Sequence, residues 1–347
     1  MPQITLNEAR AEAYRLAMAP FAFQAARAAR ELGVLTALRR APRTALELAA
    51  AVELPQTSTD ALVEACLAIG LVEEGPDGRW QISRVGRVWL VDEAIQADAA
   101  FAQEVCWAGL TDLPTALAEA KPAGLRHFGP WSTIYEGLPK LPEAARDAWF
   151  AYDHGHSDRA FGAIVERLRA RPRLRLLDVG ANTGRFSRAL LTAHAGASVT
   201  LVDHPGQLAL ARPSLCEAGV EDRAAFHGVD LLDASVAFPG GHDVVWISQC
   251  LDCFGPADIV HILRRARAAL APEGEVWVLE VCPDRQASAT AAASLRLTSL
   301  YFIALANGVS RFYRGSDYLQ LAAEAGLRPV EIVDGLGSAH SLFVLRP

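Results

Sequence analysis

The chain has 347 residues, a length that suggests two domains and supports a full hydrophobic core. Hydrophobic residues make up 51% and charged residues 21%, a globular balance that argues against extensive disorder. The net charge of -7 argues against binding to nucleic acids or to anionic membranes, because such proteins normally carry a basic stripe.

Targeting signals and cysteine usage predict a cytoplasmic protein. Residues 1–16 mix acidic and basic side chains without an apolar core, so we expect no secretion signal. The chain has no stretch of about 20 uncharged apolar residues, so we expect no membrane span. Six cysteines do not make a disulfide framework in a chain of this length. Cys250 and Cys253 form a C-x-x-C pair without a second ligand pair nearby, so we expect no metal site.

The first hundred residues predict a winged-helix-like module. Residues 8–40 have helical apolar spacing, which Gly33 can end. Thr44 has capping-box spacing at the start of the next helix, and Thr57 or Ser58 begins another. Two short strands are expected at residues 71–74 and 80–82, around a turn-rich tetrad.

A winged helix often binds DNA, so the charges of its second helix are informative. That helix, residues 57–70, contains Asp60 and Glu64 and no Lys or Arg. DNA phosphates would be repelled by such a helix. We therefore assign residues 1–100 to dimerisation or packing.

Residues 101–160 predict a helical linker. Five prolines interrupt the segment, and residues 149–158 combine aromatic with polar side chains. This composition is compatible with a helix whose aromatic side chains face a core. It is equally compatible with the wall of a ligand pocket.

From residue 172 onward the pattern alternates between strands and helices, as in a doubly wound α/β sheet. Amphipathic segments over 185–193 and 258–270 lie between strands. The strands are expected at residues 174–179, 199–203, 224–227, 243–248, 275–282, 329–333 and 340–345. Ligands of such sheets bind at the carboxyl ends of the strands. We assign residues 161–347 to this domain.

A nucleotide-binding turn follows the first of these strands. The strand ends in Asp178, and Gly180 and Gly184 bracket the turn that opens a helix. Asp203 ends the next strand, at a spacing that suits a ribose diol. The turn lacks the G-x-G-x-x-G pattern that cradles a pyrophosphate. A phosphate-free nucleoside such as S-adenosylmethionine therefore fits better than a nicotinamide dinucleotide.

A third acidic residue extends this pattern. Asp230 follows the third strand and could bind the adenine edge, while Leu231 could pack on the ring. Acids at three successive strand ends suit a ligand with hydroxyl, ammonium and sulfonium groups.

These motifs resemble the class I S-adenosylmethionine-dependent methyltransferases. Within them, the chain is similar to the two-domain small-molecule O-methyltransferases of plants and bacteria. The resemblance rests on residues 178–184, 202–203, 228–230 and 243–280. It implies a Rossmann-like methyltransferase sheet, an N-terminal winged helix that forms a homodimer, and a small aromatic substrate.

The resemblance also implies site residues. For the cofactor these are Gly180, Asp203, Asp230, Leu231 and Ser248, although the family often has a basic residue at the Ser248 position. The general base of the family is a His, and the position aligned with it here is Asp252. The first supporting acid is kept as Glu280, whereas the second is replaced near Phe312.

Asp252 can be interpreted as a base whose pKa is raised by burial, or as an acceptor that orients the substrate hydroxyl. His154, His156 or His340 could supply the base instead. We expect an aromatic pocket built from Trp149, Tyr152, Phe254, Tyr301 and Asn307.

Several functions stay open at this stage. O-methylation of a phenol in secondary metabolism follows from the resemblance. C-methylation of a phenolic ring is the alternative, because a carboxylate that holds the phenol oxygen can leave the ring carbon facing the methyl group. A cyclase, decarboxylase or hydroxylase on the same fold is a further alternative, motivated by the missing His. A winged-helix regulator and a nicotinamide oxidoreductase fit the residues less well.

Overall fold

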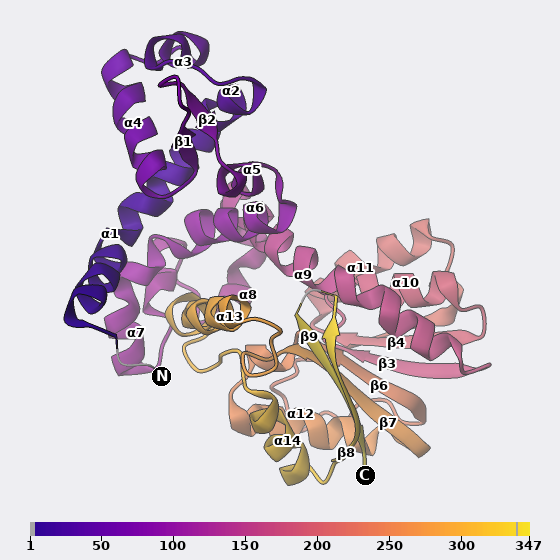
Figure 1. Cartoon of the computed structure of the whole chain (residues 1–347). Coiled ribbons are helices and arrows are strands. Elements are labelled where there is room, and N and C mark those ends of the chain that lie inside the picture. The colour runs from indigo at the N-terminus through magenta and orange to yellow at the C-terminus, as the bar shows by residue number, and fades with distance from the viewer. Residues whose placement is uncertain (1–3, 338) are drawn as a thin grey trace. The chain divides into compact units, whose positions relative to one another are not determined.

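The computed structural model describes residues 4–337 and 339–347 and divides into two compact units, Met1–Ala100 and Phe101–Pro347 (Figure 1). Residues 101–160 are thus grouped with the sheet that follows them.

The first unit is helical with one small hairpin. Its elements are α1 (Leu6–Glu31), α2 (Val34–Arg40), α3 (Ala45–Val52), α4 (Gln56–Ala68), β1 (Val72–Glu74), β2 (Trp80–Ile82), α5 (Arg84–Val91) and α6 (Glu93–Ala100). The predicted capping box is confirmed, since Glu47 N donates to Thr44 Oγ1 at 3.3 Å and Thr44 N donates to Glu47 Oε2 at 2.9 Å. The antiparallel pair β1–β2 confirms the predicted hairpin.

The predicted start of α4 at Thr57 or Ser58 is wrong. The helix begins at Gln56, because the Pro55 carbonyl already accepts the first helical hydrogen bond from Thr59 N at 3.0 Å. Proline suits the entry to a helix, since its fixed φ and missing N–H cost little there.

The second unit begins with short helices and one long one. These elements are η1 (Phe101–Cys106), η2 (Gly109–Asp112), α7 (Leu113–Glu119), η3 (Ala123–His127), α8 (Ile134–Gly137), η4 (Leu138–Lys140) and α9 (Glu143–Arg169). Prolines stand in the first turn of α7 and η4 and at the N-cap of η3 and α9, so they begin these segments instead of kinking them.

A seven-stranded sheet follows, in the order β5-β4-β3-β6-β7-β9-β8. The remaining elements are β3 (Leu174–Val179), α10 (Arg185–Ala193), β4 (Ala197–Asp203), α11 (Pro205–Glu217), η5 (Glu221–Arg223), β5 (Ala224–Gly228), β6 (His242–Ser248), η6 (Leu251–Cys253), α12 (Pro256–Ala268), β7 (Leu270–Val281), α13 (Ala289–Tyr301), η7 (Phe302–Ala306), α14 (Gly315–Glu324), β8 (Arg328–Leu336) and β9 (His340–Arg346). The seven predicted strands are all present. β3 to β7 are parallel, and β9 runs antiparallel to both β7 and β8.

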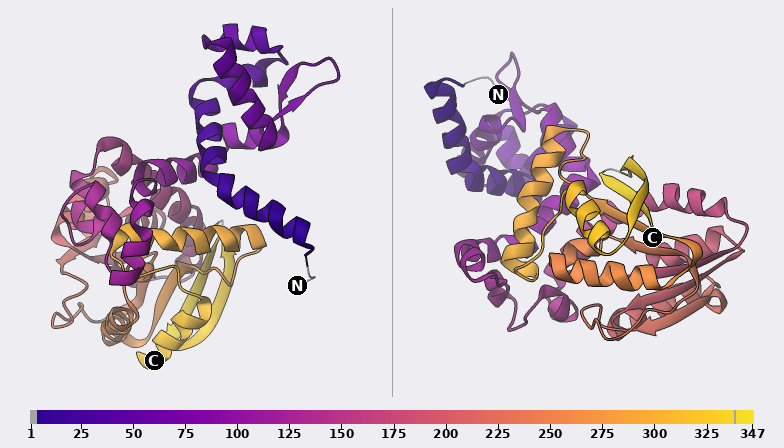
Figure 2. Two further views of the ribbon diagram at one scale, coloured as in Figure 1. Left: turned by 90° about the vertical axis from the view of Figure 1, so that its left-hand side faces the viewer. Right: turned by 90° about the horizontal axis from the view of Figure 1, so that it is seen from below.

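Helices cover both faces of the sheet (Figures 1 and 2), and a hydrophobic cluster fills the space on each side. Along β3, Leu177 packs toward the α12 and α14 side, whereas Leu176 packs toward α9, α10 and α11. This alternation follows the two-residue period of a strand. Strands β4 and β6 lie on opposite sides of β3, so the switch in strand order places the expected ligand crevice at the carboxyl ends of β3 and β6.

The segment Ala289–Ala306 is long and apolar enough to cross a membrane, judged by length and composition alone. A third of it is buried inside the protein. A core helix passes the same test, so the expectation of no membrane partner stays a prediction.

Candidate active site

The glycine turn after β3 confirms the predicted strand–turn–helix geometry. Gly180 has a φ of 75°, and its N–H donates to Val202 O at 2.9 Å. A Cβ atom at this position would lie 2.4 Å from Cys250 Sγ. Gly180 therefore lets the loops that follow β3 and β6 approach each other, and it leaves backbone exposed to a ligand.

Gly184 plays a different structural part. It precedes α10 with a φ of 72°, and a Cβ atom there would lie 2.9 Å from Leu215 and 3.0 Å from Ala211 of α11. The geometry gives Gly184 a role in helix packing, and its cofactor contact stays a prediction.

Asp203 ends β4 beside the glycine turn. Its Oδ2 accepts a hydrogen bond from Asn182 N at 2.7 Å, and its Oδ1 accepts one from His204 N at 2.6 Å. Burial raises the pKa of this carboxyl, while the two backbone donors oppose that change. Each oxygen keeps a lone pair, so the carboxylate can still bind the two hydroxyls of a ribose.

Asp178 is enclosed and 3% exposed. Its Oδ2 accepts from Ser187 Oγ at 2.5 Å, and burial raises its pKa to about 7. This bond joins β3 to α10 behind the turn, so it supports the turn whether or not Asp178 also touches the cofactor.

The loop after β5 carries the predicted adenine contacts. Asp230 is exposed, and its Oδ1 accepts from Leu232 N at 2.9 Å. Leu231 is buried in the layer shared with α12 and α14. Arg265 of α12 holds this loop by donating to the carbonyls of Leu231, Asp233 and Val236.

Arg265→Met is expected to weaken S-adenosylmethionine binding about tenfold, because the buried guanidinium satisfies three carbonyls of the loop after β5, where the adenine contacts are predicted. Methionine keeps the apolar packing but offers no donor. Isothermal titration calorimetry measures the change. Arg264→Met on the same helix, where the side chain donates to Glu324 O at the surface, is the matched control and should bind normally.

Unpartnered polar atoms mark the crevice between β3 and β6. Ser248 Oγ and Gln249 Oε1 are buried without a hydrogen-bond partner among the described residues. Gln249 also has a φ of 45°, which a side chain adopts at a cost. Together with Gly180 and Asp203 they are called the cofactor cradle. These four residues offer polar groups but no cation for a phosphate, so their chemistry fits an adenosyl group.

Asp252 lies in η6, directly after this cradle, and is 4% exposed. Burial raises its pKa to about 7. The loop is held by Glu280 of β7, whose Oε1 accepts from Cys250 N at 3.0 Å and from Leu251 N at 2.8 Å. Burial and the charge of Asp252 raise the pKa of Glu280 well above its usual value.

A second carboxyl, Asp153 of α9, is a site residue that the sequence did not single out. Its Oδ2 accepts from Asn182 Nδ2 at 3.2 Å, so it contacts the glycine turn. Burial, and next the charge of Asp252, raise its pKa to about 7. The only sequence signal was its place within the aromatic and polar stretch 149–158.

His154 lies beside Asp153 in the aromatic part of α9. Its Nε2 is 3.8 Å from Asp153 Oδ2 and has no hydrogen-bond partner among the described residues, and its ring stacks on Phe150 at 5.4 Å. Burial lowers its pKa, so the ring is neutral at pH 7. His340, another alternative base, is fully buried, with a pKa lowered to about 4.

Aromatic side chains from α9 and α13 meet next to the Asp252 loop. Trp149 Nε1 donates to the Tyr301 hydroxyl at 2.8 Å, and Tyr152 stacks on Phe101 at 4.2 Å. Phe101 also meets Tyr301 edge to face at 4.9 Å. Phe101 and Tyr135 were not predicted from the sequence. Burial is the largest cause of the raised pKa of Tyr135, and the nearby Cys253 also contributes.

Phe254 and Asn307 make contacts that differ from those expected of pocket-lining residues. Phe254 packs partly against the core under α12, and its carbonyl accepts from the Tyr313 hydroxyl at 2.8 Å. Asn307 Nδ2 donates to Cys253 O at 2.6 Å. Their predicted substrate contacts stay predictions, and the bonds observed join the loop that bears Asp252 to Tyr313 and Asn307.

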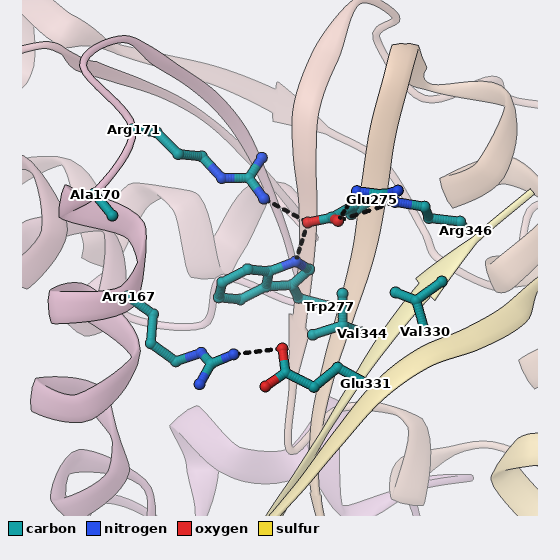
Figure 3. A pocket seen from close by; sticks show the side chains of 9 residues that line it. All are labelled: Arg167, Ala170, Arg171, Glu275, Trp277, Val330, Glu331, Val344 and Arg346. Atoms are coloured by element: carbon teal, nitrogen blue, oxygen red, sulfur yellow. Dashed lines mark hydrogen bonds and ion pairs between the residues drawn. The ribbon is translucent and has the colours of Figure 1, made fainter.

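A surface groove of about 440 Å³ lies elsewhere, between α9 and the outer strands (Figure 3). Arg171 and Arg346 both pair with Glu275, and Arg167 pairs with Glu331. Glu275 precedes Glu280 by five residues on β7, or roughly 16 Å along an extended strand. The groove is thus a paired-charge surface away from the crevice. Among the described residues, no group of three or more His, Cys, Asp or Glu side chains could hold a metal ion.

Comparison with known proteins gives this arrangement a family. Residues 14–92 match the O-methyltransferase dimerisation domain, and residues 157–328 match the O-methyltransferase domain. The L-tyrosine C(3)-methyltransferase of Streptomyces lavendulae is 28% identical over 89% of this chain and 84% of its own. The 3-hydroxy-5-methyl-1-naphthoate 3-O-methyltransferase of Streptomyces sahachiroi is 27% identical over 88% of this chain and 86% of its own.

Solved structures agree. The S-adenosylmethionine-dependent methyltransferase SibL, in its apo form, superimposes with a TM-score of 0.76 at 28% identity, covering 96% of this chain and 98% of the other. An O-methyltransferase from neocarzinostatin biosynthesis, in complex with S-adenosylmethionine and 2-hydroxy-5-methyl naphthoic acid, has the same fold at 23% identity, with a TM-score of 0.68 and coverage of 93% and 95%.

The glycine turn, the acid at the end of β4 and the two matched domains lead to one conclusion. The chain belongs to the two-domain O-methyltransferase family and is an S-adenosylmethionine-dependent methyltransferase.

Proposed function

We propose that the enzyme methylates the hydroxyl of a small phenolic acceptor in secondary metabolism, with Asp252 accepting the phenol proton. The observation that carries this proposal is the buried Asp252 carboxyl of η6, which follows the cradle residues in the chain and precedes Cys253, whose carbonyl is bonded to the segment that continues α13. The naphthoate 3-O-methylation named for one similar protein supports it, and the tyrosine named for another supports an aromatic acceptor.

Different residues of this chain bind the cofactor, orient the acceptor and accept its proton. When bound, S-adenosylmethionine supplies an electrophilic methyl group on sulfur. Asp203 and the Gly180 backbone hold the adenosyl part, while Trp149 and Tyr301 orient a flat acceptor. Alignment of this kind can supply roughly 7–11 kcal/mol of the barrier. Asp252 accepts the hydroxyl proton on its carboxylate as the oxygen becomes a nucleophile.

Burial brings the pKa of Asp252 closer to the pKa of a phenol. An ordinary carboxylate, with a pKa near 4, is far from a phenol with a pKa near 10. Burial raises the pKa of Asp252 to about 7, which reduces that gap.

The rate should therefore rise with pH. Only ionised Asp252 can accept the proton, so kcat is lost as pH falls through about 7 and levels off above it. We expect kcat at pH 6 to be about one tenth of its plateau, since one pH unit changes the ionised fraction about tenfold. Steady-state rates from pH 5.5 to 8.5 test this. A flat profile would remove Asp252 as the base.

C-methylation of a phenolic ring is a second candidate, favoured by two observations. The residue aligned with the family base is a carboxylate, and a tyrosine C(3)-methyltransferase is among the similar proteins. Asp252 would then hold the phenol oxygen while the ortho carbon faces the methyl group.

The deciding experiment uses methyl-labelled S-adenosylmethionine with a panel of hydroxybenzoates, hydroxynaphthoates and tyrosine. NMR of the product separates an aryl ether from a ring methyl. Labelled product of either kind supports methyl transfer. Cofactor binding with turnover of the acceptor but no label in any product would instead favour the non-methylating cyclase, decarboxylase or hydroxylase.

We further propose a homodimer formed through residues 1–100, supported by the match to the dimerisation domain.

A cytoplasmic location is supported by the free state of the six cysteines, which all lie within the described residues. Acidic net charge supports the absence of a nucleic-acid partner.

A further inference from the structure

We propose that Asn307 and Tyr313 are positioning residues, which fix the loop that bears Asp252 to the segment that follows α13. The last residue of α13, Tyr301, forms the acceptor wall together with Trp149. The proposal rests on the proposed function, because it assumes that Asp252 acts on the acceptor. It changes the role of Asn307 from a substrate ligand to a clamp.

The Asp252 loop, residues 250–254, is held at both of its ends. On the β7 side, Glu280 Oε1 accepts the N–H groups of Cys250 and Leu251. On the other side, Asn307 Nδ2 donates to Cys253 O at 2.6 Å, and the Tyr313 hydroxyl donates to Phe254 O at 2.8 Å. Asp252 lies between these two sets of bonds.

The hydrogen bonds of Asn307 leave little capacity for a substrate. Its Oδ1 accepts from Val309 N at 3.0 Å, from Ser310 N at 3.1 Å and from Ser310 Oγ at 3.0 Å. Two backbone donors on one oxygen fix the orientation of the amide, so the NH₂ group must face Cys253 O. The oxygen of Asn307 is therefore occupied by its own turn.

The position of Asn307 in the chain links the Asp252 loop to the end of α13. Asn307 directly follows η7, whose first turn continues α13 from Tyr301. Tyr301 is one of the aromatic residues of the acceptor wall, through its bond to Trp149. The clamp thus keeps Asp252 in register with the wall against which an acceptor lies. A misplacement of about 1 Å can cost about 100-fold in rate.

Asn307→Asp is the sharpest test. At pH 8 a carboxylate still accepts the three donors of the 309–310 turn, but it has no N–H for Cys253 O and repels it. We expect kcat to fall about 10- to 100-fold, with the acceptor KM and the S-adenosylmethionine affinity changed less than threefold. Tyr313→Phe, which removes one hydroxyl, should have the same effect to a smaller extent. Asn7→Asp, an exposed position, is the control for the added charge.

Two further readouts separate positioning from other roles. Hydrogen exchange of residues 250–254 should accelerate in Asn307→Asp even without substrate. In an Asp252→Asn background, Asn307→Asp should cause no further loss of kcat, because both changes act through one group. A raised acceptor KM with unchanged kcat, an additive loss, or unchanged exchange would overturn the proposal. If the wild-type enzyme methylates no phenol, the proposed function fails, whereas the exchange result still decides on the clamp.

Discussion

Asp252→Asn is expected to lower kcat about 100- to 10,000-fold, the usual contribution of a general base. Asparagine keeps the shape of the side chain but cannot take a proton from the acceptor. The loop should stay in place, because its bonds to Glu280, Asn307 and Tyr313 involve backbone atoms of neighbouring residues. Initial rates with labelled cofactor measure the loss.

The control for this variant is Asp147→Asn, an exposed carboxyl on α9 that should leave the rate unchanged. Calorimetry should show that Asp252→Asn still binds S-adenosylmethionine, since the cradle residues Gly180 and Asp203 are untouched. A loss of less than threefold in kcat would exclude Asp252 as the base. The next candidate base would then be His154 of α9, whose imidazole is neutral.

The pKa values of two carboxyls in the site, Asp153 and Asp252, depend on each other. The charge of Asp252 contributes to the raised pKa of Asp153, and both pKa values are about 7. Groups that interact in this way lose their protons in steps that belong to the pair. The pH profile of the wild type therefore reports on both residues, and Asp153→Asn should move its rising limb to lower pH because one negative neighbour is removed.

The sheet and the cofactor cradle were predictable from the sequence for a physical reason. β3 is a mostly apolar strand with Asp178 as its penultimate residue, and Gly180 follows where only glycine tolerates the close approach of Cys250. Strand, turn and helix are local patterns, so β3 and α10 were predicted with the bounds that they have. Carboxyl ends of parallel strands share one edge of the sheet, which brought Gly180 and Asp203 together without further information.

Contacts that cross between elements were not predictable in this way. Nothing in the spacing of α9 says that Asp153 faces Asn182, because that contact depends on how the helix rotates against the sheet. The role of Asn307 likewise depends on a bond to a residue 54 positions away. A single sequence contains the residue types of such contacts but not their pairing.

Asp203→Ala is expected to weaken S-adenosylmethionine binding at least about 100-fold, since hydrogen bonds to a charged group contribute about 1.5–3 kcal/mol each and a ribose would lose two. The change also removes the acceptor for Asn182 N and His204 N, so the glycine turn loses a support at the same time. Calorimetric titration with S-adenosylmethionine measures the affinity directly and needs no acceptor.

The matched control is Asp222→Ala, an exposed carboxyl in η5. Its cofactor affinity should match the wild type. Asp203→Asn should lie between the two, because an amide keeps one oxygen acceptor and can still hold Asn182 N or one ribose hydroxyl. An unchanged Kd in Asp203→Ala would mean that the adenosyl group does not lie at the end of β4. The glycine turn, Asp230 and Ser248 would then have no common ligand.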